Sequence, residues 1–183
     1  MKKVLIILAE GFEEIEATIS IDILRRAGLE VIVATVEDSL LVRGSRQITL
    51  QADIKLDEFK GLPDAIILPG GVAGVKKLAA SDLACTLVKK CAKENKIIAA
   101  ICAAPAYVLN VCGILEGKKA TCYPGNQVRF GSNTAYIEED VVIDGNIITS
   151  AGVGTVFDFA LAIIRKLLTE EAVLDVKEKT LIK

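Results

Sequence analysis

The sequence predicts an α/β protein with a doubly wound, mostly parallel β-sheet sandwiched between helices. Hydrophobic residues make up 52% of the chain, and they come in runs of about five or six, as expected for strands that are covered on both faces. Segments with helical spacing alternate with these runs, which is typical of a doubly wound sheet. With 183 residues, the chain is expected to form one domain spanning 1–183.

The N-terminal half begins with a β-α-β unit, in which two apolar runs flank a segment with helical spacing. Gly28 ends that helix shortly after Arg25 and Arg26, the usual chemistry of a helix C-terminus. Ser81 is a suitable N-cap for a later helix. The expected elements are a strand at 3–8, a helix at 13–27, a strand at 29–36, a small β excursion within 37–55, a strand at 65–68 and a helix at 81–94.

The C-terminal half continues this alternation. Asp144 and Gly145 are typical turn residues between two short apolar strands. The expected elements are a strand at 96–101, a helix that reaches about residue 110, a strand at 119–122, a hairpin at 137–150, a helix from 152 to 168 and a short helix from 170.

Composition excludes several classes of function. The chain has no histidine, so Ser–His–Asp catalysis, Cys–His catalysis and imidazole zinc sites cannot operate within it. No basic block or aromatic platform accompanies the net charge of −2, so no nucleic-acid partner is expected. The apolar runs are far shorter than the roughly 20 residues of a membrane helix. Glu10, Glu13 and Glu14 stand where a secretion signal would be cleaved, and we expect a cytoplasmic protein.

The segment from Ile97 to Ala106 carries the clearest functional signal. A buried strand ends at Cys102, and small residues and a proline follow at once, as in the strand–nucleophile–helix turn of hydrolases. The N–H groups and dipole of the helix behind Cys102 would favour the thiolate. The residues alone leave two alternatives open, a cysteine that packs as a small hydrophobe and one that reacts.

Sites in doubly wound sheets form beyond the carboxyl ends of the strands. This rule places the segments 11–16 and 69–71 on the same rim as Cys102, and the segment 152–155 is expected to approach it. The glycines of these segments would let backbone N–H groups come close to a bound oxyanion.

Three glutamates begin the first predicted helix. Glu13 and Glu14 are interpreted as compensation of the helix dipole. Glu16 lies one turn after Glu13, where its side chain could point back over the rim. A carboxyl group held against a thiolate has a raised pKa, and it could donate a hydrogen bond to sulfur or carry a proton during carbonyl chemistry.

The five cysteines are expected to be reduced, because none forms a Cys-x-x-Cys pair and a chain of this size needs no disulfide. Cys85 and Cys91 lie six apart on one predicted helix and cannot bridge each other. Cys112 is interpreted as buried filler. Cys122 has the same interpretation, with a resolving-cysteine role as the alternative.

Together these segments resemble the ThiJ/PfpI superfamily, in the branch of the Parkinson-associated protein DJ-1 and its bacterial relatives. The resemblance runs from residue 1 to about 168 and rests on LAEGFEEIEA, DILRRAGLEV, GSRQITL, ILPGG, AAICAAPA, ITSAGVGT and FDFALAI. It implies a flavodoxin-like sandwich that forms homodimers. Relatives act as redox sensors, as stress chaperones, or as glyoxalases and deglycases on methylglyoxal and its adducts.

The resemblance also implies roles for particular residues. Cys102 falls on the reactive, oxidisable cysteine of the family and Glu16 on its protonated partner. Gly71, with Gly70 beside it, and Ala103 fall on the backbone donors of the oxyanion site. Arg46 matches an arginine near that site, and Arg26 matches one that reaches it from the partner subunit.

One departure from the family pattern concerns Tyr123, which stands where many members have a histidine. A Cys–His peptidase is therefore not expected. The resemblance still implies a glyoxalase or deglycase, because Glu16 can carry the proton, and this chemistry requires neither metal nor cofactor. The alternatives are a redox sensor or chaperone-like protein with little turnover, and a dimer whose site has decayed.

Overall fold

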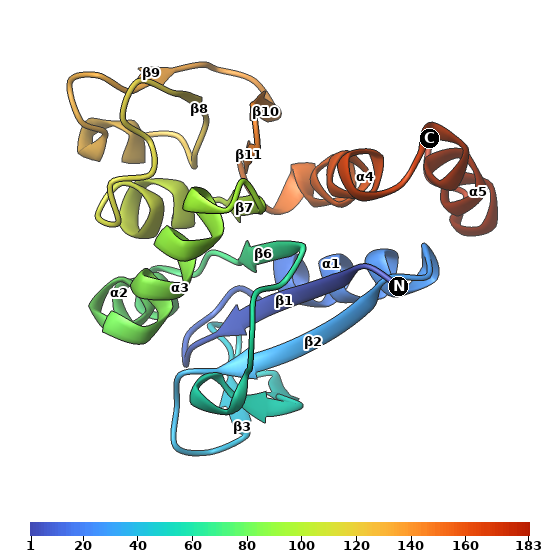
Figure 1. Cartoon of the computed structure of the whole chain (residues 1–183), viewed down its shortest axis with the longest axis horizontal. Helices are drawn as coiled ribbons and strands as arrows, with labels where there is room; N and C mark the ends of the chain where they lie inside the picture. Colours follow the sequence, from blue (N-terminus) through green and yellow to red (C-terminus); the bar gives the residue numbers. More distant parts are fainter.

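The computed structural model describes residues 1–183 and confirms the predicted α/β fold (Figure 1). Seven strands form one sheet in the order β10-β11-β7-β6-β1-β2-β5, and every neighbouring pair is parallel except β10 with β11. These strands are β1 (Lys3–Leu8), β2 (Glu30–Thr35), β5 (Ile54–Lys55), β6 (Ala65–Leu68), β7 (Ile97–Ile101), β10 (Val141–Asp144) and β11 (Ile147–Ser150).

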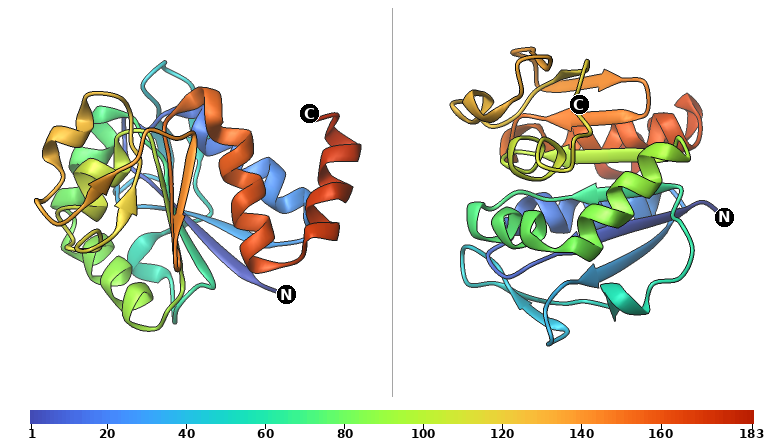
Figure 2. Two further views of the ribbon diagram at one scale, coloured as in Figure 1. Left: turned by 90° about the horizontal axis from the view of Figure 1, so that it is seen from above. Right: turned by 60° about the vertical axis from the view of Figure 1, so that its left-hand side comes forward.

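Helices cover both faces of the sheet (Figure 2). The five helices are α1 (Glu14–Arg26), α2 (Val72–Ala80), α3 (Asp82–Lys93), α4 (Val156–Leu167) and α5 (Glu170–Thr180). Strand β1 is apolar from Val4 to Leu8 and contributes side chains to both layers. Val4 and Ile6 pack in the cluster that contains α1, α4 and α5, whereas Leu5 and Ile7 pack in the one that contains α2 and α3. All four side chains are fully buried, which explains why the sequence shows a continuous apolar run here.

Shorter elements lie around the main sheet. The predicted β excursion is a hairpin of β3 (Leu41–Arg43) and β4 (Thr49–Gln51). A second small sheet pairs β8 (Lys119–Ala120) with β9 (Ala135–Tyr136). Three short 3₁₀ turns lie at Leu56–Glu58, Asn126–Arg129 and Val153–Thr155.

The structure departs from the sequence predictions in several places. Helix α2 was not predicted, because Gly74 interrupts a segment of only nine residues. The strand expected at 119–122 ends at Ala120, and the predicted hairpin begins at Val141 rather than 137. The segment after Cys102 is a π-helix at Pro105–Leu109, a form that periodicity does not distinguish from an α-helix.

The chain order reverses between β1 and β6, which lie side by side in the sheet although β2 continues the chain on the other side of β1. The carboxyl ends of β1 and β6 therefore border the crevice where doubly wound sheets bind ligands. Strand β7, which precedes Cys102, is the next neighbour of β6. None of the five helices is both long and apolar enough to cross a lipid bilayer.

Candidate active site

Cys102 occupies a strained turn between β7 and the π-helix. Its φ of +63° lies in the left-handed region, which non-glycine residues rarely adopt. The backbone is held from two sides, because Cys102 N–H donates to the carbonyl of Ser150 at 2.9 Å and the Cys102 carbonyl accepts from Tyr123 N–H at 2.8 Å. The predicted elbow is therefore present, and its strain is retained by hydrogen bonds from two other segments.

Glu16 reaches the same place from the first turn of α1. Its side chain is fully buried, and Oε2 accepts a hydrogen bond from Gly70 N–H at 2.7 Å, while Oε1 has no partner. Gly70 lies against both the Glu16 carboxyl group and Cys102, which also contact each other. A Cβ added to Gly70 would lie 2.6 Å from Glu16 Oε2 and 2.7 Å from Cys102 Cβ, so only glycine fits beside the two reactive groups.

The carboxyl group holds its proton unusually well. Burial raises the pKa of Glu16 to about 7, although the hydrogen bond from Gly70 and the contact with Cys102 oppose the shift. Burial also raises the pKa of the Cys102 thiol above its usual value, and the charge on Glu16 raises it further. The backbone N–H groups of Ala103 and Gly71 act in the opposite direction and stabilise the thiolate.

These shifts correct the expectation of a simply acidic thiol. Cys102 becomes a better acid only when Glu16 is protonated, because the charge on Glu16 is one of the causes that raise the thiol pKa. The two groups therefore titrate as a pair, and the first proton leaves the pair near neutral pH. The singly charged pair has two forms, one with a carboxylate and a thiol and one with a carboxylic acid and a thiolate.

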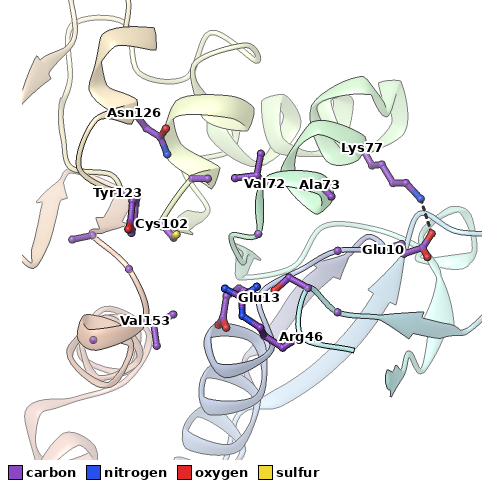
Figure 3. Close-up of a pocket in the computed structure, with 18 of the residues that line it drawn as sticks. Glu10, Glu13, Arg46, Val72, Ala73, Lys77, Cys102, Tyr123, Asn126 and Val153 are labelled. Atoms are coloured by element: carbon purple, nitrogen blue, oxygen red, sulfur yellow. Dashed lines mark hydrogen bonds and ion pairs between the residues drawn. The ribbon is translucent and has the colours of Figure 1, made fainter. Parts of the chain in front are cut away.

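A cavity of about 1160 Å³ opens above Cys102 (Figure 3). The predicted residues that line it are Gly71, Cys102, Ala103, Arg46 and Tyr123, and the segment 152–155 also reaches it. Figure 3 shows Cys102 and Tyr123 together on one wall, and Arg46 beside Glu13 on the other. The cavity thus joins the carboxyl ends of β1, β6 and β7, as the rim argument predicted.

Arg26 does not line this cavity. It lies at the opposite end of α1 from Glu14, about 18 Å along the helix axis, where its exposed guanidinium pairs with Asp22 at 2.6 Å. Its predicted approach to the site could therefore come only from another subunit, and that prediction stays untested.

Glu14 has a role that the sequence interpretation missed. Its side chain is buried, and its carboxylate accepts hydrogen bonds from the backbone N–H of Arg46, the hydroxyl of Ser45 and the backbone N–H of Ile48. Burial alone would raise the pKa of Glu14, but these bonds outweigh burial and hold the pKa below its usual value. Glu14 thus fastens the loop that carries Arg46, whereas Glu13 caps α1 by accepting from Glu16 N–H at 2.8 Å.

The expectation that all cysteines are reduced is wrong. Cys85 on α3 and Cys112 after the π-helix form a disulfide, with Cα atoms 5.7 Å apart. These residues are 27 apart in sequence, and they come together because α3 and the segment around Cys112 lie in the same apolar cluster. Cys91 and Cys122 are free and fully buried, and burial raises the pKa of each to about 11. Nothing in this environment supports a resolving role for Cys122.

The fold and the site define a class of α/β proteins that carry a cysteine on a strand–turn–helix elbow, with a buried carboxyl group as its neighbour. Comparison with known proteins agrees. Residues 2–166 match the model of the DJ-1/PfpI family. The chain therefore belongs to the DJ-1/PfpI family.

Several relatives illustrate the similarity. DJ-1 homolog B of Arabidopsis thaliana is 43% identical over 98% of the chain, which spans only 41% of that relative's length. A glutathione-independent glyoxalase of Caenorhabditis elegans is 37% identical, with 91% of this chain and 89% of the relative covered. The crystal structure of a DJ-1 superfamily mutant protein from Salmonella typhimurium superposes with a TM-score of 0.96 at 36% identity, with all of both chains covered.

Proposed function

We propose that this protein is a cofactor-independent glyoxalase or deglycase that acts on methylglyoxal and related aldehydes or glycated substrates through Cys102 and Glu16. One observation carries the proposal. A carboxyl group whose pKa is raised to about 7 by burial contacts a half-buried thiol that lines the cavity, and the backbone of Gly70 lies against both groups. The glyoxalase name of the Caenorhabditis elegans relative supports the same chemistry.

The singly charged pair supplies both groups that the reaction needs. The Cys102 thiolate attacks the aldehyde carbon, and the aldehyde oxygen takes the proton of Glu16, which gives a hemithioacetal. Glu16, now a carboxylate, removes the proton from the former aldehyde carbon and returns it to the neighbouring carbon, while the hydroxyl proton of the hemithioacetal passes to the neighbouring carbonyl oxygen. The result is a lactate thioester, and addition of one water releases lactate and the free thiol.

The surrounding residues would assist particular steps. The N–H groups of Gly71 and Ala103 already favour negative charge at this position, since they lower the pKa of Cys102, and they would stabilise the oxyanion formed during attack. Arg46 and Tyr123 line the cavity and would bind the remainder of the substrate.

Lactate formation from methylglyoxal tests the proposal. Wild-type protein should produce lactate without glutathione, and Cys102→Ser should abolish it. Cys122→Ser is the matched control, because Cys122 is also a free thiol but is fully buried. Equal turnover by the wild type and Cys102→Ser would refute the proposal.

A second candidate function is that of a redox sensor or chaperone-like protective protein with little turnover. The difference in solvent exposure among the three free cysteines favours it. Cys102 is partly exposed and lines the cavity, whereas Cys91 and Cys122 are fully buried. Mild peroxide should therefore add two oxygens at Cys102 first. Intact mass and peptide mapping would measure this order, and oxidation of Cys91 or Cys122 at the same rate would reject the sensor.

We also propose that the chain forms a homodimer through an apolar surface around α1. Ile15, Ile48 and Phe157 are between 41% and 55% exposed, which is high for side chains of this size. Such a dimer is the arrangement in which Arg26 could approach a partner's cavity. Sedimentation should give a dimer for the wild type and a monomer for Ile48→Lys, and a wild-type monomer would reject the proposal.

A further inference from the structure

The disulfide and the active-site cavity are connected by one continuous segment. The helix that begins behind Cys102 runs through the bonds Tyr107 N–H to Ala103 carbonyl at 3.0 Å and Asn110 N–H to Pro105 carbonyl at 3.0 Å. It ends with Cys112 N–H donating to the carbonyl of Val108 at 2.9 Å. Its first turn therefore faces the sulfur of Cys102, and its last residue is bonded to α3.

The same helix end holds the segment 123–131, called the cavity wall here because its residues Tyr123, Pro124 and Asn126 line the cavity. The side-chain amide of Asn110 donates to the carbonyl of Arg129 at 2.7 Å, and its oxygen accepts from Gly131 N–H at 3.1 Å. The guanidinium of Arg129 also lies 4.1 Å from the ring centre of Tyr107. At its other end the segment is fixed by the bond between Tyr123 N–H and the Cys102 carbonyl.

Tyr123, Pro124 and Asn126 line the cavity from between these two anchors. The Asn110 bonds are exposed to solvent, so each contributes little unless the helix end that carries Asn110 is fixed. Cys112 is two residues from Asn110, and its bond to Cys85 provides that fixation. Val108 and Leu109 are fully buried, so the body of the helix stays packed whatever the state of the disulfide.

We propose that Cys85 and Cys112 form a second redox site, separate from Cys102, whose disulfide fixes the cavity wall 123–131 and whose reduction loosens that wall. This regulation rests on the proposed role of Cys102 as the reactive thiol of the cavity, but testing it requires no turnover.

The redox step is a thiol–disulfide exchange with a small thiol such as glutathione. A thiolate attacks Cys85 Sγ, because Cys85 is partly exposed while Cys112 is buried, and Cys112 leaves as a thiolate that takes a proton. A second small thiol then releases Cys85. Two electrons and two protons reach the protein, and the small thiols become one disulfide, so a reducing compartment opens the site and an oxidising one closes it.

The first test counts thiols. Protein equilibrated with oxidised dithiothreitol, whose mixed disulfides with single cysteines do not persist, and then denatured and alkylated without reductant, should take up three labels, because three cysteines are free. After reduction it should take up five, the total in the chain. Peptide mapping should place the two additional labels on Cys85 and Cys112. Five labels before reduction would overturn the proposal.

The second test compares two reagents for Cys102, the small iodoacetamide and a bulky fluorescein maleimide. Opening the disulfide, by Cys85→Ser or by reduction of the wild type, should raise the rate with the bulky reagent relative to the small one by about three- to tenfold, a range typical of local coupling. Cys91→Ala is the matched control on α3, because Cys91 is outside the disulfide, and its ratio should equal that of the oxidised wild type. An unchanged ratio in Cys85→Ser would overturn the proposal.

Amide hydrogen exchange gives an independent answer that does not involve Cys102. Reduction should accelerate exchange within 123–131 and leave β11 unchanged. Cys102 could prove unreactive in the oxidised wild type, the reduced wild type and Cys85→Ser while reduction still accelerates exchange within 123–131. In that case the proposed function is wrong and the second redox site is supported. If exchange within 123–131 is the same in both redox states, the second redox site is wrong.

Discussion

Glu14 and Glu16 are two buried glutamates on the same turn of α1, yet their chemistry is opposite. The carboxylate of Glu14 accepts three hydrogen bonds from the 45–48 loop, and its pKa is lowered. Glu16 has one donor, Gly70 N–H, and a free Oε1, and its pKa is raised to about 7. Burial favours the neutral acid in both, so the number of hydrogen-bond donors decides which one stays charged.

This difference distinguishes a carboxylate with a structural role from a carboxyl group that can transfer a proton. Glu14 is satisfied by its neighbours and fixes a loop, whereas Glu16 keeps an unused oxygen and a mobile proton beside a sulfur atom. Substitution by glutamine, which retains shape and removes charge, should therefore have opposite consequences at the two positions.

The largest expected effect is on turnover. Glu16→Gln removes the proton carrier and should lower kcat for methylglyoxal by about 10²- to 10⁴-fold, the usual contribution of general acid–base catalysis. Glu14→Gln should instead act mainly on KM, because Glu14 positions the loop that carries Arg46. Steady-state kinetics on both variants measures kcat and KM separately. A similar loss of kcat in both variants would contradict the assignment of Glu16 as the proton carrier and Glu14 as a structural carboxylate.

The next effect is on stability at Glu14. Glu14→Gln replaces a charged acceptor by a group with a single acceptor oxygen, and it should destabilise the fold by about 2–3 kcal/mol at pH 7. Because the pKa of Glu14 is lowered, its stabilisation is present above the ordinary carboxyl pKa and is lost as the pH falls through the lowered value. Urea unfolding at pH 7 and pH 3 measures this, and the variant should differ less from the wild type at pH 3.

Glu16→Gln should change stability with the opposite sign. The raised pKa of Glu16 means that the folded protein holds a proton which the unfolded chain has lost between pH 4.5 and about 7. Wild-type stability should thus fall as the pH rises through that window, whereas the neutral glutamine is insensitive. The variant should be more stable than the wild type by about 3 kcal/mol at pH 8 and show little difference at pH 4. Lower stability of the variant at pH 8 would contradict a protonated Glu16.

The smallest effect is expected at the far end of the same helix. Arg26 is exposed and pairs only with Asp22, so Arg26→Ala should leave the melting temperature of the isolated chain unchanged. A lowered activity in a dimeric preparation, with an unchanged melting temperature, would place Arg26 in the partner's cavity. Equal activity of Arg26→Ala and the wild type would show that Arg26 does not act in the partner's cavity.

Most of the fold was predictable because the buried strands are continuous apolar runs and the helices alternate with them. Strand β6 matches its prediction residue for residue, and Ser81 caps α3 as expected, accepting from Ala84 N–H at 3.2 Å. The elbow at Cys102 was predictable because an apolar run ends there and small residues follow, as a crowded, strained turn requires. Helix α2 escaped prediction because it is short and contains a glycine.

What the sequence did not indicate depends on contacts between distant segments. The charge state of Glu14 is set by a loop more than 30 residues away, at Ser45, Arg46 and Ile48. The Cys85–Cys112 disulfide likewise depends on the tertiary fold, which brings α3 next to the segment that follows the π-helix. Residue types and spacing place candidate groups on a rim, but the donors that tune them come from tertiary packing.

The pH dependence of Cys102 alkylation, measured on the wild type and Glu16→Gln, tests the central claim most directly. If the two groups titrate as a pair, the wild-type rate should rise with an inflection near pH 7, and Glu16→Gln should lose that inflection and keep a single transition of the thiol. Profiles of the same shape in both proteins would contradict the account, because Glu16 would then not share its proton with Cys102.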